Sequence, residues 1–190
     1  MDIDHFIQEC KSIKDGSFEL RPVSTATLKS LNIAEPDIEF FTQCGLPESA
    51  APFLNFEGER VKWEEEYFGI DMLISKYPFL NESYNKYVCI GHNGCGDPIV
   101  LNLENRIVEV LNHDNDFEPI FMNSSVFDLA KFLLIYRQFV IEVISLNGQD
   151  AFLNRKFSEK QFSQLKQKFE AIDPKALQLG FWHAELEYYL

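Results

Sequence analysis

The sequence lacks the features that mark exported and membrane-spanning chains. Only four cysteines occur in 190 residues, and no pair of them has the C-x-x-C spacing: Cys10, Cys44, Cys89 and Cys95. The N-terminus has no basic start followed by an apolar run, so no signal peptide is expected. No stretch of 18 apolar residues is present to span a membrane. We therefore expect a cytoplasmic protein with free thiols and no membrane partner.

Positive charge is also scarce. Seventeen Lys and Arg stand against 30 Asp and Glu, which gives a net charge of −13. Such a chain repels the phosphate backbone, so direct binding to nucleic acid is not expected. The same field would steer a basic protein partner toward the surface, although acidity can also serve solubility alone.

Apolar residues, in contrast, are abundant: 46% of the chain is hydrophobic and 18 residues are Phe. A chain of this length buries about 70% of the surface that its unfolded form exposes. One domain spanning residues 1–190 therefore needs neither disulfides nor a metal to hold its core.

The order of patterns predicts an α+β fold with a central antiparallel or mixed sheet and helices packed around it. Four segments rich in β-branched and aromatic residues predict strands: Lys86–Gly91, Ile99–Leu103, Arg106–His113 and Glu118–Asn123. Their short connections predict an antiparallel meander. Ser125 then caps a helix from Val126 to about Leu146, which is apolar nearly all round and is expected to lie buried across the sheet.

Shorter helices are predicted on both sides of this centre. Apolar residues at helical spacing near the N-terminus indicate an amphipathic helix. Pro36 and Gly45 bracket a second helix. Ser158 and Gln161 form a capping box that starts a C-terminal helix.

The segment between the second helix and the first predicted strand of the meander has less regular signals. Pro47 and Pro52 are expected to exclude a regular element between them. Residues 57–71 are rich in acids and are expected to form an exposed loop or a sheet edge.

The turn GHNGCGDP contains three glycines, Gly91, Gly94 and Gly96. A phosphate-binding loop would have to open a helix, whereas this one leads through Asp97 and Pro98 into a strand. We therefore expect a structural turn whose glycines supply positive φ. Asp97 is expected to cap backbone N–H groups of that turn.

Two chemical alternatives use residues near this turn. A metal site would draw on five side chains: His92, Asp97, His113, Asp114 and Asp116. The HDND motif lacks the Gly and the Glu that a calcium loop needs at its sixth and twelfth positions, so neither a metal nor another cofactor is expected. A cysteine hydrolase would use Cys95 with His92 or His113, but free cysteines are more commonly small core residues, and no catalytic residue is assigned.

The acid-rich segments provide the binding hypothesis. Residues 37–71 hold nine acids and two bases, together with Trp63, Tyr67 and Phe68. Aromatic residues can anchor a protein partner while carboxylates steer it; alternatively, Trp63 and Phe68 belong to the core and the acids only face water. The predicted partner-binding residues are Glu57, Glu59, Trp63, Glu64, Glu65, Glu66, Asp71, Asp114, Asp116 and Glu118.

Three stretches taken in order, GLPESAAPFLNF, YVCIGHNGCGDPIVLNLENRIVEVLNHD and FMNSSVFDLAKFLLIY, resemble the SUKH superfamily of immunity and regulatory proteins. The closing DPKALQLGFWHAELEYYL is similar to its fourth subfamily. The resemblance covers a core of about residues 38–145, with helical additions at both ends. It implies a SUKH-like α+β fold and a cytoplasmic bacterial immunity protein, not an enzyme, that blocks a cognate toxin, often a nuclease. The alternative within the same fold is an intracellular regulator or scaffold.

Overall fold

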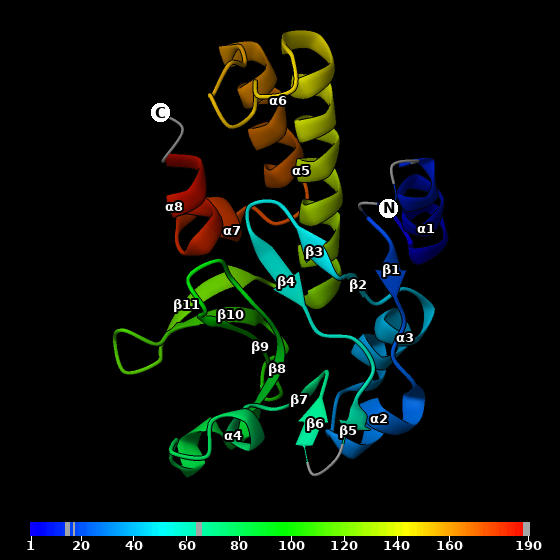
Figure 1. Cartoon of the computed structure of the whole chain (residues 1–190), viewed down its shortest axis with the longest axis vertical. Coiled ribbons are helices and arrows are strands. Elements are labelled where there is room, and N and C mark those ends of the chain that lie inside the picture. The colour runs from blue at the N-terminus through cyan, green and yellow to red at the C-terminus, as the bar shows by residue number, and fades with distance from the viewer. Residues whose placement is uncertain (14–15, 17, 64–65, 188–190) are drawn as a thin grey trace.

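The computed structural model describes residues 1–13, 16, 18–63 and 66–187, and a seven-stranded antiparallel sheet forms its centre (Figure 1). The strand order is β11-β10-β9-β8-β4-β3, with β7 also paired to β8. The strands are β3 (Ser49–Ala50), β4 (Leu54–Phe56), β7 (Asp71–Met72), β8 (Tyr87–His92), β9 (Pro98–Asn102), β10 (Val108–Asn112) and β11 (Glu118–Asn123). The four consecutive strands β8 to β11 confirm the predicted meander and the α+β class.

Two further sheets have two strands each. One pairs β1 (Leu20–Arg21) with β2 (Leu46–Pro47), and the other pairs β5 (Val61–Trp63) with β6 (Glu66–Phe68). The expectation of no regular element between the two prolines is wrong, because Pro47 ends β2 and β3 follows it. Strands as short as these tolerate a proline at the edge of a ladder. Within the acid-rich segment, expected to be an exposed loop or a sheet edge, the structure has strands: the β5–β6 hairpin, and β7, which among the described strands pairs with β8 alone.

Helices cover both faces of the central sheet. They are α1 (Ile3–Ser12), α2 (Thr25–Ser30), α3 (Glu35–Gln43), α4 (Leu73–Lys76), α5 (Val126–Asn147), α6 (Glu159–Glu170), α7 (Lys175–Gln178), α8 (Phe181–Glu187) and the 3₁₀ helix η1 (Glu82–Lys86). The predicted caps are present: Ser125 accepts the Asp128 N–H, and Ser158 and Gln161 form a capping box. No helix in the described part of the chain is both long enough and apolar enough to cross a membrane.

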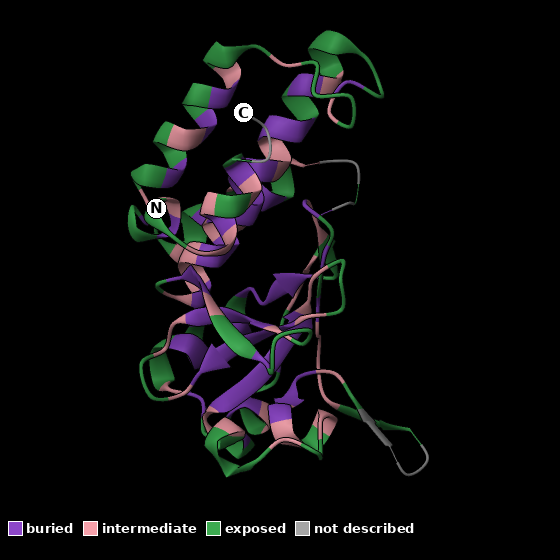
Figure 2. Ribbon diagram, turned by 90° about the vertical axis from the view of Figure 1, so that its left-hand side faces the viewer, coloured by how far each residue is buried: buried purple, intermediate pink, exposed green. Residues whose placement is uncertain are grey.

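Alternating side chains along the strands face two separate cores. Ile99 and Leu101 on β9 pack into the large core with the buried face of α5, as the period-two pattern predicts. Val100, between them, faces a smaller core with Leu73 of α4 and Phe117. In Figure 1, α5 to α8 lie on one side of the sheet and α4 lies on the other, and Figure 2 shows the buried residues concentrated in the sheet between them.

Buried hydrogen bonds fix the C-terminal helices to the sheet. The Trp182 indole N–H donates to Asn123 Oδ1 at 2.9 Å, and both residues are fully buried. Asp173 accepts the Ser124 backbone N–H at 2.7 Å and the Ser124 hydroxyl at 3.0 Å. These bonds join the segment before α7 and the helix α8 to the junction of β11 and α5.

Candidate functional site

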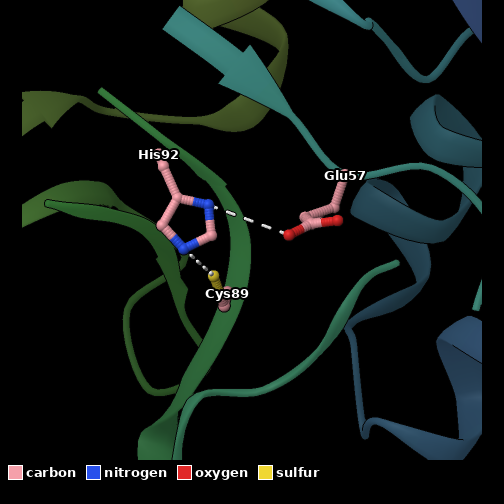
Figure 3. Close-up of side chains that lie close together, drawn as sticks. All are labelled: Glu57, Cys89 and His92. Atoms are coloured by element: carbon pink, nitrogen blue, oxygen red, sulfur yellow. Dashed lines mark hydrogen bonds and ion pairs between the residues drawn. The ribbon is translucent and has the colours of Figure 1, made fainter. Parts of the chain in front are cut away.

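The side chains of Glu57, Cys89 and His92 meet where the loop after β4 approaches β8 (Figure 3). His92 Nδ1 lies 3.8 Å from Glu57 Oε1, and His92 Nε2 lies 3.8 Å from Cys89 Sγ. Lys76 Nζ of α4 donates to Glu57 Oε1 at 2.7 Å, and the Tyr77 hydroxyl lies 3.2 Å from His92 Nε2. The imidazole is thus held between a carboxylate on one nitrogen and a thiol and a phenol on the other.

This cluster contains ligand types that zinc accepts, because carboxylate, thiolate and imidazole all coordinate it. The three ligand atoms lie within 4.8 Å of one another. However, Glu57 and Cys89 face different nitrogens of the same ring, whereas an ion bound to His92 lies along the lone pair of a single nitrogen. The Lys76 ammonium also already pairs with Glu57. As arranged, the cluster is a polar bridge between α4, β8 and the loop after β4.

The same cluster has the acid, imidazole and thiol order of a catalytic triad, but its thiol is not activated. Cys89 is fully buried, and burial raises the pKa of its thiol to about 12. The thiolate that a nucleophile needs is therefore not formed at neutral pH. Burial also lowers the pKa of His92 below its ordinary value, which favours the neutral imidazole. Cys95, the nucleophile of the hydrolase alternative, lies in the exposed β8–β9 turn, and it is Cys89 that lies beside His92.

The three glycines of GHNGCGDP have different roles, and the expectation that all supply positive φ is wrong. Only Gly96 has a positive φ, of 88°. Gly91 lies within β8, where a Cβ would lie 2.3 Å from the Asn55 carbonyl oxygen, so it permits the close approach of β4. At Gly94 a Cβ would lie 3.0 Å from the Cβ of Phe53.

Asp97 does not cap its own turn, contrary to the expectation. Asn93 Oδ1 accepts the N–H groups of Cys95 and Asp97, each at 2.9 Å. Asp97 instead accepts from the backbone N–H and Nδ1 of His113, at 3.0 and 2.6 Å, and so links the β8–β9 turn to the β10–β11 turn. Burial raises the pKa of Asp97, but the hydrogen bonds from His113 and Asn93 outweigh it and hold that pKa below its ordinary value.

The five residues considered as a metal set fall into separate groups. His113 lies between Asp97 on Nδ1 and Asp114 on Nε2, the latter at 3.4 Å. His92 belongs to the Glu57 cluster described above. Asp116 is an exposed turn residue with a φ of 49°, whose backbone carbonyl accepts the Tyr84 hydroxyl.

Among the acids predicted to face a partner, Glu57, Glu59 and Asp71 tie together separate parts of the chain. Glu59 accepts the Ser24 backbone N–H at 2.5 Å and the hydroxyls of Ser24 and Thr27, at the start of α2. Burial raises the pKa of Glu59, but these hydrogen bonds outweigh it and lower that pKa overall. Glu59 therefore connects the base of the β5–β6 hairpin to α2.

Asp71 is buried, so its predicted exposure is wrong. Its Oδ2 lies 2.9 Å from Arg60 Nη2. Arg60 precedes the hairpin in the chain and Asp71 follows it. Next to this pair, the Ile70 N–H donates to the Gly58 carbonyl oxygen at 3.0 Å. Gly69, with a φ of 95°, packs so closely against the backbone of Glu59 that a Cβ on it would lie 2.2 Å from the Glu59 carbonyl oxygen. These contacts, which we call the hairpin base, hold the two ends of the hairpin together.

The hairpin itself exposes aromatic and aliphatic side chains. Trp63 is 71% exposed, Val61 53% and Phe68 50%, so the alternative that places Trp63 and Phe68 in the core is wrong. Glu66 begins β6, whereas Glu64 and Glu65 lie outside the described residues. A partner-binding role for this segment stays a prediction.

The second acidic segment lies at the β10–β11 turn. Asp114 is 87% exposed, and Asp116 and Glu118 are also exposed. Phe117 between them is buried and packs against the ring of Phe79, whose centroid is 5.8 Å away. Phe79 is 75% exposed, and sequence reasoning missed it because one aromatic residue in a proline-containing loop carries no periodic signal.

No curated protein and no solved structure matches this chain. A family model described as SUKH-4 immunity protein matches residues 16–188, which is most of the chain and includes the sheet, the hairpin and the C-terminal helices. The chain therefore belongs to the SUKH-4 immunity protein family.

Proposed function

We propose that this protein binds and neutralises a cognate bacterial toxin through an acidic surface, and that the toxin is a basic protein of the nuclease class. Membership in the SUKH-4 immunity family supports the immunity role. The observation that carries the finer proposal is the charge of −13. Nucleases need basic surfaces to hold a phosphate backbone, so an acidic inhibitor complements the surface that it must block.

The acidic charge is concentrated in the sheet-containing part of the chain. Residues 1–154 hold 25 acids and 11 bases, whereas residues 155–175 hold six bases and three acids. A basic toxin would therefore be attracted to the sheet and repelled by α6. The carboxylates of Asp114, Asp116 and Glu118 are exposed and can contribute to this attraction, although Asp114 lies near His113 and Glu118 accepts from Asn115. Glu48 beside the hairpin base can also contribute, because it remains 79% exposed while it pairs with Arg21 at 3.5 Å.

A cavity of about 510 Å³ at the hairpin base adds to the case. Its lining includes the carboxylates of Glu48, Glu57 and Glu59, together with Arg21 and His92. Carboxylates that line a cavity are suited to a lysine or arginine side chain of a partner. Glu57 and Glu59 would take part here through their remaining acceptor capacity, since both already bind groups of this chain.

The first experiment is a pull-down from lysate of the source organism with this protein as bait, followed by mass spectrometry of the bound proteins. Recovery of a basic toxin domain at one-to-one stoichiometry, and loss of its nuclease activity on adding the bait, is the expected result. A bound toxin with a different activity would contradict the nuclease class. Recovery only of host proteins without toxic activity would favour the regulator or scaffold alternative.

Charge reversal then tests the acidic surface. One variant replaces three acids of the hairpin segment with Lys: Glu64, Glu65 and Glu66. A second variant replaces three acids at the β10–β11 turn with Lys: Asp114, Asp116 and Glu118. A matched control reverses three exposed acids near α5 and α6: Glu142, Asp150 and Glu170. The reversal of interface acids should slow association about tenfold or more at low salt and flatten its salt dependence. Equal association rates for all three variants would refute the acidic surface.

A further inference from the structure

We propose that the apolar face of the β5–β6 hairpin, formed by Val61, Trp63 and Phe68, is the anchor by which this protein holds its basic toxin. The proposal rests on the proposed function, because the partner is the toxin. The anchor residues contact the toxin directly. The acids of the hairpin base have a different role, because they position the hairpin and are not part of the anchor.

The strand register places these three side chains on one face. Val61 pairs with Phe68 across the hairpin, and Trp63 pairs with Glu66. Directly opposed residues of an antiparallel pair share a face, and residues two apart on one strand also share a face. Val61, Trp63 and Phe68 therefore lie on one face of the hairpin, and each is at least half exposed.

Contacts at the hairpin base tie the hairpin to the rest of the chain. Within the described residues, β5 and β6 pair with each other and with no other strand, and Figure 2 shows them extending away from the main body. An isolated two-stranded hairpin is marginal in water. The Arg60–Asp71 ion pair, the Ile70–Gly58 hydrogen bond and the link from Glu59 to α2 supply the support that its own pairing lacks.

This arrangement favours binding. A partner that meets an already ordered hairpin does not pay the entropy of ordering it. Trp is also the residue type most enriched among those that dominate binding energy at protein interfaces. A large apolar face on a supported projection fits a concave site on the partner.

The negative charge of this chain favours a basic toxin, and not a second copy of the chain, as the partner that binds the hairpin face. The segment 37–71, which carries the hairpin, has nine acids and two bases, and the whole chain has a net charge of −13. Two copies docked through this face would bring like charges together, which opposes association. A basic toxin reverses the sign of that interaction.

The test measures the affinity for the toxin domain recovered by the pull-down, in a catalytically inactive form. We expect Trp63→Ala to weaken binding at least 30-fold, and the double variant Val61→Thr with Phe68→Thr to weaken it at least tenfold. Leu146→Ala is the matched control, because Leu146 is 67% exposed but lies near the C-terminal end of α5, outside the hairpin and both acidic segments; it should change affinity less than threefold. Full affinity in the Trp63 and double variants would overturn the proposal.

A spectroscopic readout locates the contact directly. The chain has two tryptophans, Trp63 exposed and Trp182 buried, so a 5-fluorotryptophan-labelled sample gives one signal from each. Adding unlabelled toxin should shift the Trp63 fluorine signal and remove its H₂O/D₂O solvent effect, while the Trp182 signal stays in place and shows that the fold is intact. An unshifted Trp63 signal in a saturated complex would place the contact elsewhere.

The positioning role of the hairpin base needs its own variants. Asp71→Arg should weaken toxin binding about tenfold with the anchor residues unchanged, and the swap with Arg60→Asp should recover most of the loss. Loss of affinity without recovery in a folded swap variant would contradict the positioning role. Failure of the unaltered chain to bind any toxin would instead remove the proposed function, and a dimer that dissociates on Trp63→Ala would identify a second copy as the occupant.

Discussion

Replacing Trp182 with phenylalanine should destabilise the fold by about 2–4 kcal/mol, more than a change between two aromatic residues usually costs. The indole is fully buried against the rings of Phe132 and Phe169, each with its centroid 5.4 Å away. Its N–H donates to Asn123 Oδ1, which is also buried. Phenylalanine keeps the ring packing in part but removes the donor.

The expected loss of stability in this variant has two parts. A buried acceptor that loses its donor costs about 1–3 kcal/mol. The smaller ring leaves a void, which adds about 1 kcal/mol or more depending on how far the site collapses. A domain of this kind has a total stability of roughly 5–15 kcal/mol, so the variant should remain folded but be measurably weaker.

Urea unfolding followed by far-ultraviolet circular dichroism measures this loss without relying on the tryptophan that was removed. With a slope of about 2 kcal/mol per molar urea, the middle of the usual range of about 1–3, the midpoint should fall by about 1–2 M. A double-mutant cycle with Asn123→Ala isolates the hydrogen bond, and we expect a coupling of about 1 kcal/mol. A loss below about 0.5 kcal/mol, in the range of ordinary surface changes, would refute the reasoning.

Three further predictions concern stability and reactivity. Asp37→Ala should lower the free energy of unfolding by about 1–3 kcal/mol, measured by thermal unfolding, because the buried carboxylate of Asp37 accepts two hydrogen bonds from Arg106, at 2.8 and 2.9 Å. The loss should not be larger, because Arg106 is partly exposed and water can hydrate it when its partner is removed. Titration of the native protein with a thiol reagent should modify Cys95 rapidly and the three buried cysteines only after unfolding, and two rapid thiols would contradict the burial described. Because the folded pKa of Asp97 is depressed, its contribution to stability is fully present above the unfolded pKa near 4 and is lost as the pH falls through the folded pKa. Asp97→Asn should therefore destabilise the protein at pH 7, and the difference from the unaltered protein should shrink as the pH is lowered below 4; a difference that stays constant down to the acid unfolding transition would contradict this.

Features that depend on neighbours in the sequence were predicted well. The helix caps at Ser125 and Ser158 need only a side chain and the N–H three residues later, so the sequence contains both partners. The meander likewise follows from strands joined by short turns. The family resemblance was also visible in the order of these elements, and the family match confirms it.

Features that depend on distant partners were not predictable in the same way. Glu57 binds Lys76, which is 19 residues away, and Glu59 binds Ser24, which is 35 residues away. A free carboxylate and a paired one look the same in a sequence, so the acid-rich segment was expected to be exposed throughout. Gly91 was expected at the end of a strand and to supply positive φ to the turn; its actual role depends on how closely β4 approaches, which only the folded sheet determines.

The bonds from the C-terminal helices to β11 have a consequence for the time at which the fold is completed during translation. β11 is the last strand at its end of the sheet, and α7 and α8 pack along it, with the Phe121 carbonyl oxygen so near Gly180 that a Cβ there would lie 2.0 Å away. Trp182 leaves the ribosome 59 residues after its partner Asn123. Until then the outer strand and the apolar surface of α5 lack their cover, and uncovered strands and surfaces of this kind recruit other unfolded chains. Each newly made molecule therefore passes through an interval, set by the rate of elongation, in which the outer strand and the apolar surface of α5 are open to contact with other unfolded chains.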